Sequence, residues 1–310
     1  MAADPKPTAV LLLAHGSPDR AEEVPEFLKY VTGGRPMPPA AVEEIAHRYS
    51  LIGSSPLTQL TMQQGQALAR ALRLPVYVGM RNWKPFIPDV VKTMVADGAQ
   101  HVIAICMAPQ NSRTSVGLYR RAVEAEQGAA FGLDFVESWH DHPLLARAFA
   151  EKLRIGWNRA CVEAGEQVPV IFTAHSVPQR TITDGDPYEA QAYETAQLVA
   201  QAADLGQDDW LFAFQSQGLS GGPWIGPTVE DMIVRCKEKG HSSVFIQPIG
   251  FLCDHVEILY DIDIAFRDFA EKKGMRLRRA DSLNDSPTLT AALADLARSR
   301  MQKPDLQRRA

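Results

Sequence analysis

Short apolar runs alternate with amphipathic segments along nearly the whole chain of 310 residues. Each run has the length of a buried strand, and the segments between them repeat apolar residues at helical spacing. The runs cover residues 8–14, 75–80, 101–112, 133–139, 168–174, 209–215, 242–248 and 275–280. The helix-like segments cover 21–30, 40–49, 57–72, 85–99, 116–127, 187–204, 227–239, 254–273 and 286–301. This alternation predicts an α/β protein with parallel sheets covered by helices on both faces.

The second half of the chain repeats the pattern of the first. Four runs fall in each half, and the peptide Ala14–Pro18 (AHGSP) resembles Ala174–Pro178 (AHSVP), each after the first run of its half. Such an internal repeat indicates a duplicated unit. We therefore predict two similar doubly wound, Rossmann-like halves, with residues 1–160 as the N-terminal half and 161–310 as the C-terminal half.

The composition is that of an ordinary globular protein. Hydrophobic residues make up 45% of the chain, and the net charge of −5 argues against a nucleic-acid binder. No run approaches the ~20 apolar residues of a membrane span, and no signal-peptide pattern precedes the first run. We expect a cytoplasmic monomer without a nucleic-acid partner.

The cysteines give no sign of a metal cluster. Cys106, Cys161, Cys236 and Cys253 stand singly, without the C-x-x-C spacing of zinc or iron–sulfur sites. We expect four buried thiols.

A histidine and a group of acidic residues follow two of the runs. His175 comes directly after the run 168–174, at a strand end where open α/β sheets place ligands. The run 242–248 leads into an acidic helical segment, in which Glu257 and Asp261 are four positions apart and share one helix face. Either feature alone can be purely structural. An imidazole and carboxylates can move protons or bind a metal ion, and the motifs around these residues favour such a functional site.

Five motifs in this region resemble, in order, those of the ferrochelatase family, whose members insert Fe²⁺ into a porphyrin. They read TAHSVP, GDPYEAQ, FQSQG, W-x-x-P and GFLCDHVEILYDID. They include His175, Gly185 to Tyr188, Phe214 to Gln217, Trp224 to Pro227 and Gly250 to Leu259. Segments of the first half, such as RYSLIGSSPLTQLT and APQNSRTSVGLY, match as well, so the resemblance spans nearly the whole chain. It implies a chelatase-type fold in which two α/β halves enclose a cleft for the porphyrin.

The resemblance also implies roles for the residues of the second half. His175 and Glu257 would be the catalytic pair and would contact the metal, and Asp261 would continue the acidic face as a metal ligand or proton path. Many members carry a further acidic residue where this chain has Ala265, so the path is expected to be shorter here. Fe²⁺ is then a substrate, and we expect neither a tightly bound cofactor nor an iron–sulfur cluster.

Residues of the first half would bind the porphyrin. The candidates are His15, Arg35, Arg48, Tyr49, Ser55 and Tyr119. Four of them match positions that bind substrate in coproporphyrin-using members, and Arg35 either adds a cation for a propionate or is solvated surface. The aromatic lip of membrane-contacting members is not evident. We therefore expect coproporphyrin III in preference to protoporphyrin IX, and at most peripheral membrane contact.

His15 departs from the family pattern. Coproporphyrin-using members usually have a tyrosine facing the metal at this position, and other members usually have an apolar residue. A neutral imidazole could ligate the iron, or it could only hydrogen-bond the neighbouring loop, and both alternatives stay open. The turn before Ser55 is also one residue shorter than in the pattern, and Ser176 replaces a glycine.

Two other functions deserve comparison. The segment LLLAHGSP around His15 resembles the start of small cobalt or nickel chelatases that act on sirohydrochlorin-like tetrapyrroles, although the later motifs follow the ferrochelatase pattern. A carrier that binds a tetrapyrrole without catalysis is a third possibility, and the presence of both His175 and Glu257 argues against it.

Overall fold

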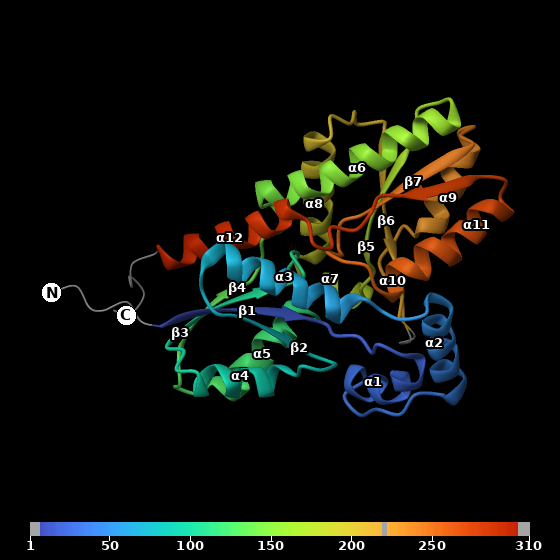
Figure 1. Cartoon of the computed structure of the whole chain (residues 1–310). Helices are drawn as coiled ribbons and strands as arrows, with labels where there is room; N and C mark the ends of the chain where they lie inside the picture. Colours follow the sequence, from blue (N-terminus) through green and yellow to red (C-terminus); the bar gives the residue numbers. More distant parts are fainter. Residues whose placement is uncertain (1–6, 219–221, 303–310) are drawn as a thin grey trace.

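The computed structural model describes residues 7–218 and 222–302 of the chain. Within these residues the predicted runs form the strands of two four-stranded sheets (Figure 1). The strands are β1 (Thr8–Ala14), β2 (Val76–Met80), β3 (His101–Cys106), β4 (Gly132–Val136), β5 (Val170–His175), β6 (Trp210–Gln215), β7 (Ser243–Pro248) and β8 (Arg276–Arg279). The predicted α/β class is therefore confirmed.

The two sheets have the same topology. Their strand orders are β2-β1-β3-β4 and β6-β5-β7-β8, and all neighbouring strands are parallel. The register corresponds too, because Ala14 of β1 pairs with Met80 and Ala174 of β5 pairs with Phe214, and each alanine precedes a histidine. The predicted duplication of a doubly wound unit is thus confirmed.

Strand β1 shows why such runs are apolar throughout. Val10 and Leu12 belong to a core that extends into the second half, whereas Leu11 and Leu13 pack on the other face of the sheet. Successive side chains of a strand point to opposite faces, so a strand with helices on both sides must be apolar at every position.

Every predicted helical segment contains helix. The helices are η1 (Ala21–Glu23), α1 (Val24–Val31), α2 (Pro39–Ile52), α3 (Leu57–Leu72), α4 (Ile87–Ala96), α5 (Val116–Gln127), α6 (Pro143–Ala164), α7 (Gln179–Thr183), α8 (Tyr188–Ala202), α9 (Val229–Glu238), α10 (Val256–Leu259), η2 (Asp261–Phe266), α11 (Arg267–Lys272) and α12 (Pro287–Met301). The short α7 and the long α6 were not predicted.

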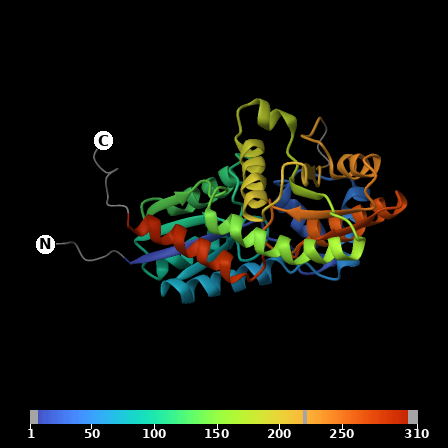
Figure 2. The same ribbon diagram turned by 90° about the horizontal axis from the view of Figure 1, so that it is seen from above.

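Helix α6 changes the division between the halves. A boundary at residue 160 would cut this helix, which ends only at Gly165 and packs against β7, β8 and α8 of the second half. At the end of the chain, α12 crosses back to α3 and β3 of the first half (Figures 1 and 2). The chain therefore enters the second half near residues 137–142 and returns at its last helix. Gly156, near residue 160, lies inside α6 without interrupting it, and Gly165 caps the end of the helix.

The segment 254–273 is not one continuous α-helix, contrary to the prediction. Four residues of α10 are followed by a π-helical turn, η2, before α11 begins. The N–H groups of Ile264 and Ala265 both donate to the carbonyl of Tyr260, at 3.1 and 2.9 Å. The bond from Ala265 spans five residues, which widens the turn as π-helical insertions do.

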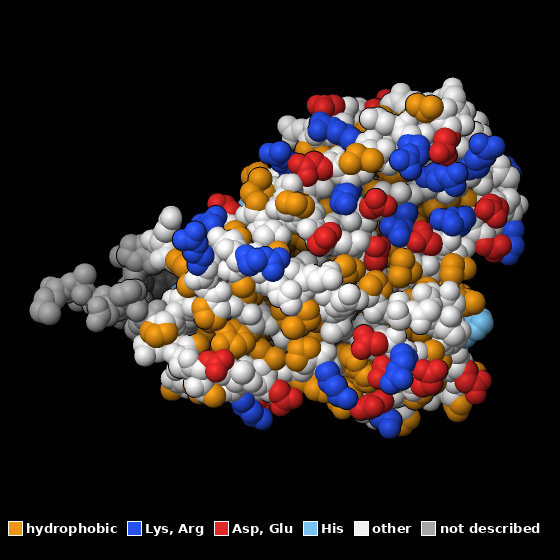
Figure 3. Space-filling model, in the orientation of Figure 1, with side chains coloured by type: hydrophobic (Ala, Val, Ile, Leu, Met, Phe, Trp, Pro, Cys, Tyr) orange, Lys and Arg blue, Asp and Glu red, His pale blue; other side chains and the backbone are white. Residues whose placement is uncertain are grey.

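The sequence argues against a nucleic-acid binder and against a membrane span. On the face shown in Figure 3, acidic and basic side chains are interspersed over both halves. No helix of the described residues combines the length and the apolar character needed to cross a membrane.

Of the four cysteines, all free, Cys161 is only partly buried, because it lies near the exposed end of α6, and the other three are buried as expected.

Candidate active site

The predicted catalytic pair comes from two neighbouring elements of the second half. His175 ends β5, and Glu257 is the second residue of α10, which begins beyond the end of β7. Nε2 of His175 lies 3.6 Å from Oε2 of Glu257. The side chains are 35% and 31% exposed. Solvent therefore reaches the pair, although protein surrounds most of it.

A second histidine, His255, contacts the same carboxylate oxygen. Its Nε2 lies 3.7 Å from Oε2 of Glu257, and its Nδ1 bonds the carbonyl of Cys253 at 3.0 Å. Burial lowers the pKa of His255, but the contact with Glu257 outweighs burial and raises it. Burial raises the pKa of Glu257, and the charges of His175 and His255 bring it down to about 2. Glu257 is therefore an ionised carboxylate shared by two imidazoles.

The ring of His175 is oriented by its own backbone. Nδ1 hydrogen-bonds the carbonyl oxygen of Ser176, which can only accept, so Nδ1 carries the hydrogen of the neutral ring. The hydroxyl of Tyr188, from the GDPY motif, donates to the carbonyl of His175 at 2.9 Å. Nε2 therefore holds the lone pair and is directed to the side of Glu257, where it can accept a proton or bind a metal ion.

Gln215, at the end of β6, connects β5, the strand that carries His175, to the backbone of Glu257. Its side-chain oxygen accepts from Thr173 of β5 at 2.7 Å, and its side-chain nitrogen donates to the backbone carbonyl of Glu257 at 2.9 Å. Gln215 is 2% exposed, so both bonds are shielded from water. Neither Gln215 nor His255 was singled out from the sequence, although both lie inside the quoted motifs FQSQG and GFLCDHVEILYDID.

Asp261 lies close to Glu257, as its predicted helix position required. Burial and the negative charge of Glu257 raise the pKa of Asp261 to about 6. The hydroxyl of Ser216 donates to its carboxylate, and Nη1 of Arg48 lies 4.0 Å from it. Ser216 has a φ of 59°, a left-handed conformation that is uncommon for serine and is often found at functional sites.

The other acidic residues of this segment have structural partners. Asp263 accepts two bonds of 2.8 Å from the guanidinium of Arg279. Asp254 accepts from Ser282 and Asn284 at 2.7 and 2.9 Å. The acidic segment therefore divides into residues that hold the fold and residues that face the site.

Known proteins resemble this chain over nearly its whole length. The family model described as Ferrochelatase matches residues 7–301. A ferrochelatase from Acidobacterium capsulatum is 60% identical over 309 residues, which is 95% of this chain and 95% of the relative. A coproporphyrin III ferrochelatase from a Geobacillus species is 32% identical over 308 residues, which is 96% of this chain and 99% of the relative.

The chain belongs to the ferrochelatase family.

Its activity is therefore that of a metal-insertion lyase of haem biosynthesis, with Fe²⁺ and a porphyrin as substrates. The fold agrees with that of other chelatases. SirB from Bacillus subtilis, solved with Fe³⁺, superposes with a TM-score of 0.61 at 11% sequence identity, over 96% of both chains. At this identity the likeness shows a common fold alone, so the predicted chelatase-type fold is confirmed.

His15 is placed near the pair, on the other half of the enzyme. It follows β1, and its charge and that of Glu257 influence each other's ionisation. Nδ1 of His15 lies 2.9 Å from the carbonyl oxygen of Gly16, and Nε2 lies 2.9 Å from Nδ2 of Asn82. Protein packed around the ring and the charge of Arg81 lower its pKa to about 4, although the side chain is open to solvent.

Arg48 reaches the second half of the enzyme. It lies on α2, which contacts α10 (Figure 1). Its guanidinium is 5.0 Å from the ring centre of Tyr260 and 3.0 Å from the carboxylate of Glu44, in addition to its contact with Asp261. Part of this side chain, 39%, is exposed and can take a further anionic partner.

Tyr49 and Ser55 are buried in this structure. Tyr49 is 2% exposed, and its hydroxyl shares a hydrogen bond of 2.9 Å with Ser17. Ser55 is 3% exposed, and its hydroxyl has no hydrogen-bond partner among the described residues. Pro56 occupies the N-cap of α3, and Ser55 does not cap that helix.

Two further candidates have partners other than the catalytic pair. Tyr119 of α5 is 5% exposed and packs under Arg81, whose guanidinium is 5.8 Å from the ring centre. Arg35 lies in an exposed loop, where its Nε donates to the carbonyl of Thr32 at 3.0 Å. Tyr119 is thus connected to His15 through Arg81, and Arg35 remains an outlying cation.

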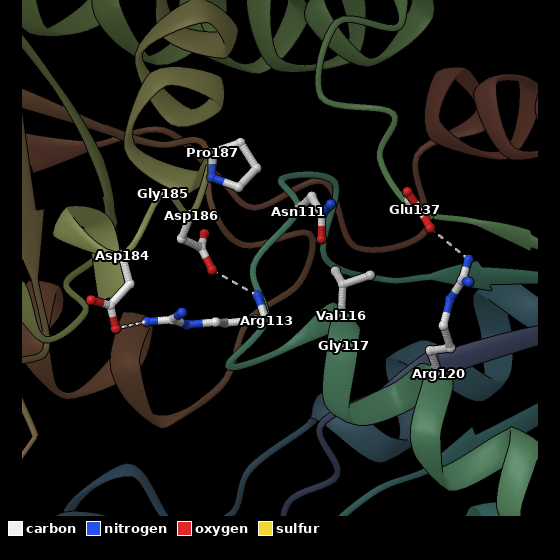
Figure 4. A pocket seen from close by; sticks show the side chains of 10 residues that line it. All are labelled: Asn111, Arg113, Val116, Gly117, Arg120, Glu137, Asp184, Gly185, Asp186 and Pro187. Carbon is white, nitrogen blue, oxygen red and sulfur yellow. Dashed lines mark hydrogen bonds and ion pairs between the residues drawn. The ribbon is translucent and has the colours of Figure 1, made fainter. Parts of the chain in front are cut away.

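The GDPY motif borders a pocket of about 310 Å³ between the halves. Figure 4 shows Arg113 of the first half directed at Asp184 of the second, at 2.8 Å, and Asp186 accepting from the backbone of Arg113 at 2.8 Å. Arg120 pairs with Glu137 at 2.7 Å on the opposite wall. Both arginines of this pocket pair with acidic residues of its lining, and the contacts of Arg113 tie the two halves together.

Within residues 7–218 and 222–302, no three histidine, cysteine, aspartate or glutamate side chains form a group that could hold a metal ion.

Proposed function

We propose that the enzyme inserts Fe²⁺ into coproporphyrin III in preference to protoporphyrin IX, with His175 and Glu257 receiving the two protons that leave the pyrrole nitrogens. The observation that carries this proposal is the 3.6 Å contact between Nε2 of His175 and Oε2 of Glu257 at a solvent-accessible position. Nε2 has a lone pair for a pyrrole proton, and the ionised carboxylate stabilises the imidazolium that results.

Glu257 and Asp261 offer a route for iron and protons. Carboxylate oxygens and imidazole nitrogens are both suitable ligands for Fe²⁺. Glu257 is ionised, whereas Asp261 changes its charge near a pH of about 6, so a proton can pass from the pair toward Asp261. The next position of the family's acidic path is Ala265 here, and Asp263 is held by Arg279. We therefore propose that the route ends at Asp261.

The porphyrin preference is proposed from charge. Coproporphyrin III carries four propionates and protoporphyrin IX carries two, and a propionate binds best to a guanidinium with free donors. Arg48 is partly exposed beside the site and can offer such donors. Relatives described as coproporphyrin III ferrochelatases, such as that of the Geobacillus species, align over nearly the whole chain. The more similar Acidobacterium relative is described only as a ferrochelatase.

The test is anaerobic Fe²⁺ insertion into coproporphyrin III, protoporphyrin IX and sirohydrochlorin, followed by absorbance. We expect the highest kcat/KM with coproporphyrin III. Equal kcat/KM values for the first two porphyrins would refute the preference, and faster turnover of sirohydrochlorin would favour the alternative chelatase reaction. Binding of all three without any turnover would indicate a carrier.

A further inference from the structure

The two histidines that follow the equivalent alanines of β1 and β5 have the same local setting. Nδ1 of His15 bonds the carbonyl oxygen of Gly16, as Nδ1 of His175 bonds that of Ser176. A carbonyl oxygen only accepts hydrogen bonds, so each neutral ring carries its hydrogen on Nδ1 and its lone pair on Nε2. The duplication has therefore produced two imidazoles with the same tautomer.

The two Nε2 atoms have different partners. Nε2 of His175 faces the carboxylate of Glu257, whereas Nε2 of His15 lies 2.9 Å from the amide nitrogen of Asn82. With the hydrogen on Nδ1, Nε2 of His15 must accept a hydrogen bond from Asn82. The Nε2 lone pair, with which this imidazole would bind a metal ion, is then occupied by the hydrogen bond from Asn82. The low pKa of His15, about 4, keeps the ring neutral at pH 7.

Asn82 is held in place by the same turn. It follows β2, it is 3% exposed, and its backbone N–H donates to the carbonyl of His15 at 2.9 Å. By strand register, the corresponding residue of the second half is Ser216, whose hydroxyl bonds Asp261 and leaves His175 open. The turn after β2 therefore occupies Nε2 of His15 with a hydrogen bond, whereas the equivalent turn after β6 leaves Nε2 of His175 without such a bond.

We propose that Asn82 is a positioning residue of iron insertion, which keeps Nε2 of His15 occupied so that this imidazole does not bind the iron of the product. The ring of His15 lies 5.9 Å from that of Phe27, whose hydrophobic cluster packs against Val256 beside Glu257, so an unmasked Nε2 would stand on the first-half side of the same site. Imidazole is a good ligand for iron, and an added bond to the product would slow its release. The inference rests on the iron insertion common to the family and not on the porphyrin preference.

The test uses the full chain and iron(III) coproporphyrin III, with iron(III) protoporphyrin IX as a second probe. Asn82→Leu removes the donor and fills a similar volume. We expect the variant to gain the absorbance and electron paramagnetic resonance signature of an added imidazole ligand and to release the iron porphyrin about tenfold or more slowly. The double variant His15→Phe with Asn82→Leu should lose this signature, which would assign it to His15.

A second readout needs no porphyrin. Nitrogen-15 NMR of labelled histidines should show the wild-type His15 with hydrogen on Nδ1 and a hydrogen-bonded Nε2, and Asn82→Leu with the same tautomer and an unbonded Nε2. Asn82→Ala takes its place if the leucine variant has a lowered melting temperature. Both readouts are independent of turnover, so a wrong porphyrin preference would not alter them.

Three results would overturn the proposal. The first is a wild-type complex that already shows an imidazole signature which His15→Phe removes. The second is an Asn82→Leu complex with the spectra and release rate of the wild type, or with a signature that persists in the double variant. The third is a wild-type His15 with its hydrogen on Nε2.

Discussion

Glu257 determines what His175 can do, because it is the only carboxylate among the described residues that contacts both His175 and His255. Its pKa of about 2 means that it is ionised before the porphyrin binds. The carboxylate lies 3.6 Å from Nε2 of His175, where it can stabilise the positive charge of a proton that this ring takes up during the reaction. His175 and Glu257 therefore act together, and substitution of either residue should lower the rate of iron insertion.

The first prediction is that His175→Ala and Glu257→Gln each lower kcat for iron insertion by about two orders of magnitude or more, because each removes a proton acceptor. Porphyrin affinity, measured by fluorescence quenching, should change little. His241→Ala, which replaces a histidine in the loop before β7, is the matched control and should behave as wild type. A variant of the pair with near-normal kcat would remove that residue from the mechanism.

The second prediction concerns Asp261, whose pKa is raised to about 6 by burial and by Glu257. If its carboxylate receives protons, turnover should rise with pH through about 6, and this limb should be absent in Asp261→Asn. Stability gives an independent check. A raised pKa means that the folded state binds this proton more tightly than the unfolded state, so the wild type loses stability as the pH rises from about 4 to about 6.

Asp261→Asn lacks this loss, and its melting temperature relative to the wild type should increase over the same interval. A difference in melting temperature that does not change with pH would show that the carboxyl group has an ordinary pKa.

At the scale of elements, the exit of β7 fixes the distance between β5 and α10. Gly250 lies where a Cβ atom would be 3.1 Å from the backbone Cα of Ala174 and 3.5 Å from the backbone nitrogen of His175. The two backbones can approach only because this residue has no side chain. The strand end that carries His175 therefore depends on Gly250.

The third prediction follows from this contact. Gly250→Ala should lower the free energy of unfolding by about 1–3 kcal/mol, because the added methyl group has no space. It should also lower kcat, because His175 moves relative to Glu257. Gly117→Ala, in α5, places its methyl group at ordinary contact distances of 3.7 Å or more and is the control. Equal unfolding curves for Gly250→Ala and the wild type would contradict the account of this exit.

The elements differ in how well the sequence predicts them. Every strand was predicted, because a strand covered on both faces must be apolar throughout and this pattern is local. The π-helical turn at Asp261–Phe266 was not, because no local spacing marks it, and Asp263 within it pairs with Arg279, sixteen residues later. The predicted boundary at residue 160 falls inside α6, and the contacts of this helix with α8, β7 and β8 are made by elements far along the chain, which local spacing does not reveal.

The site was predictable to a similar degree. His175, Glu257 and Asp261 were identified because they lie at strand and helix ends inside recognisable motifs, and the structure brings them together. His255, Gln215 and Asn82 were not identified as site residues. Their roles depend on partners 2, 42 and 67 positions away, and the two longer separations cannot be read from local spacing.

At the scale of the whole molecule, Arg48 connects the halves at the site, because it lies on α2 and contacts Tyr260 and Asp261. The fourth prediction is that Arg48→Ala raises KM for coproporphyrin III about tenfold, the loss expected for one charge-assisted contact, with a smaller effect on kcat. Arg70→Ala, an exposed residue of α3, is the control. A change confined to kcat would show that Arg48 does not bind the propionates.

The central claim is that the halves bring a porphyrin to His175 and Glu257, which take up its two pyrrole protons as iron enters. The most direct test records iron coproporphyrin III formation by absorbance and proton release by a pH indicator in one anaerobic, weakly buffered reaction. The account predicts two protons released for each iron inserted by the wild type, and neither signal from His175→Ala with porphyrin bound. Iron insertion at the wild-type rate by His175→Ala, with the same proton release, would contradict it.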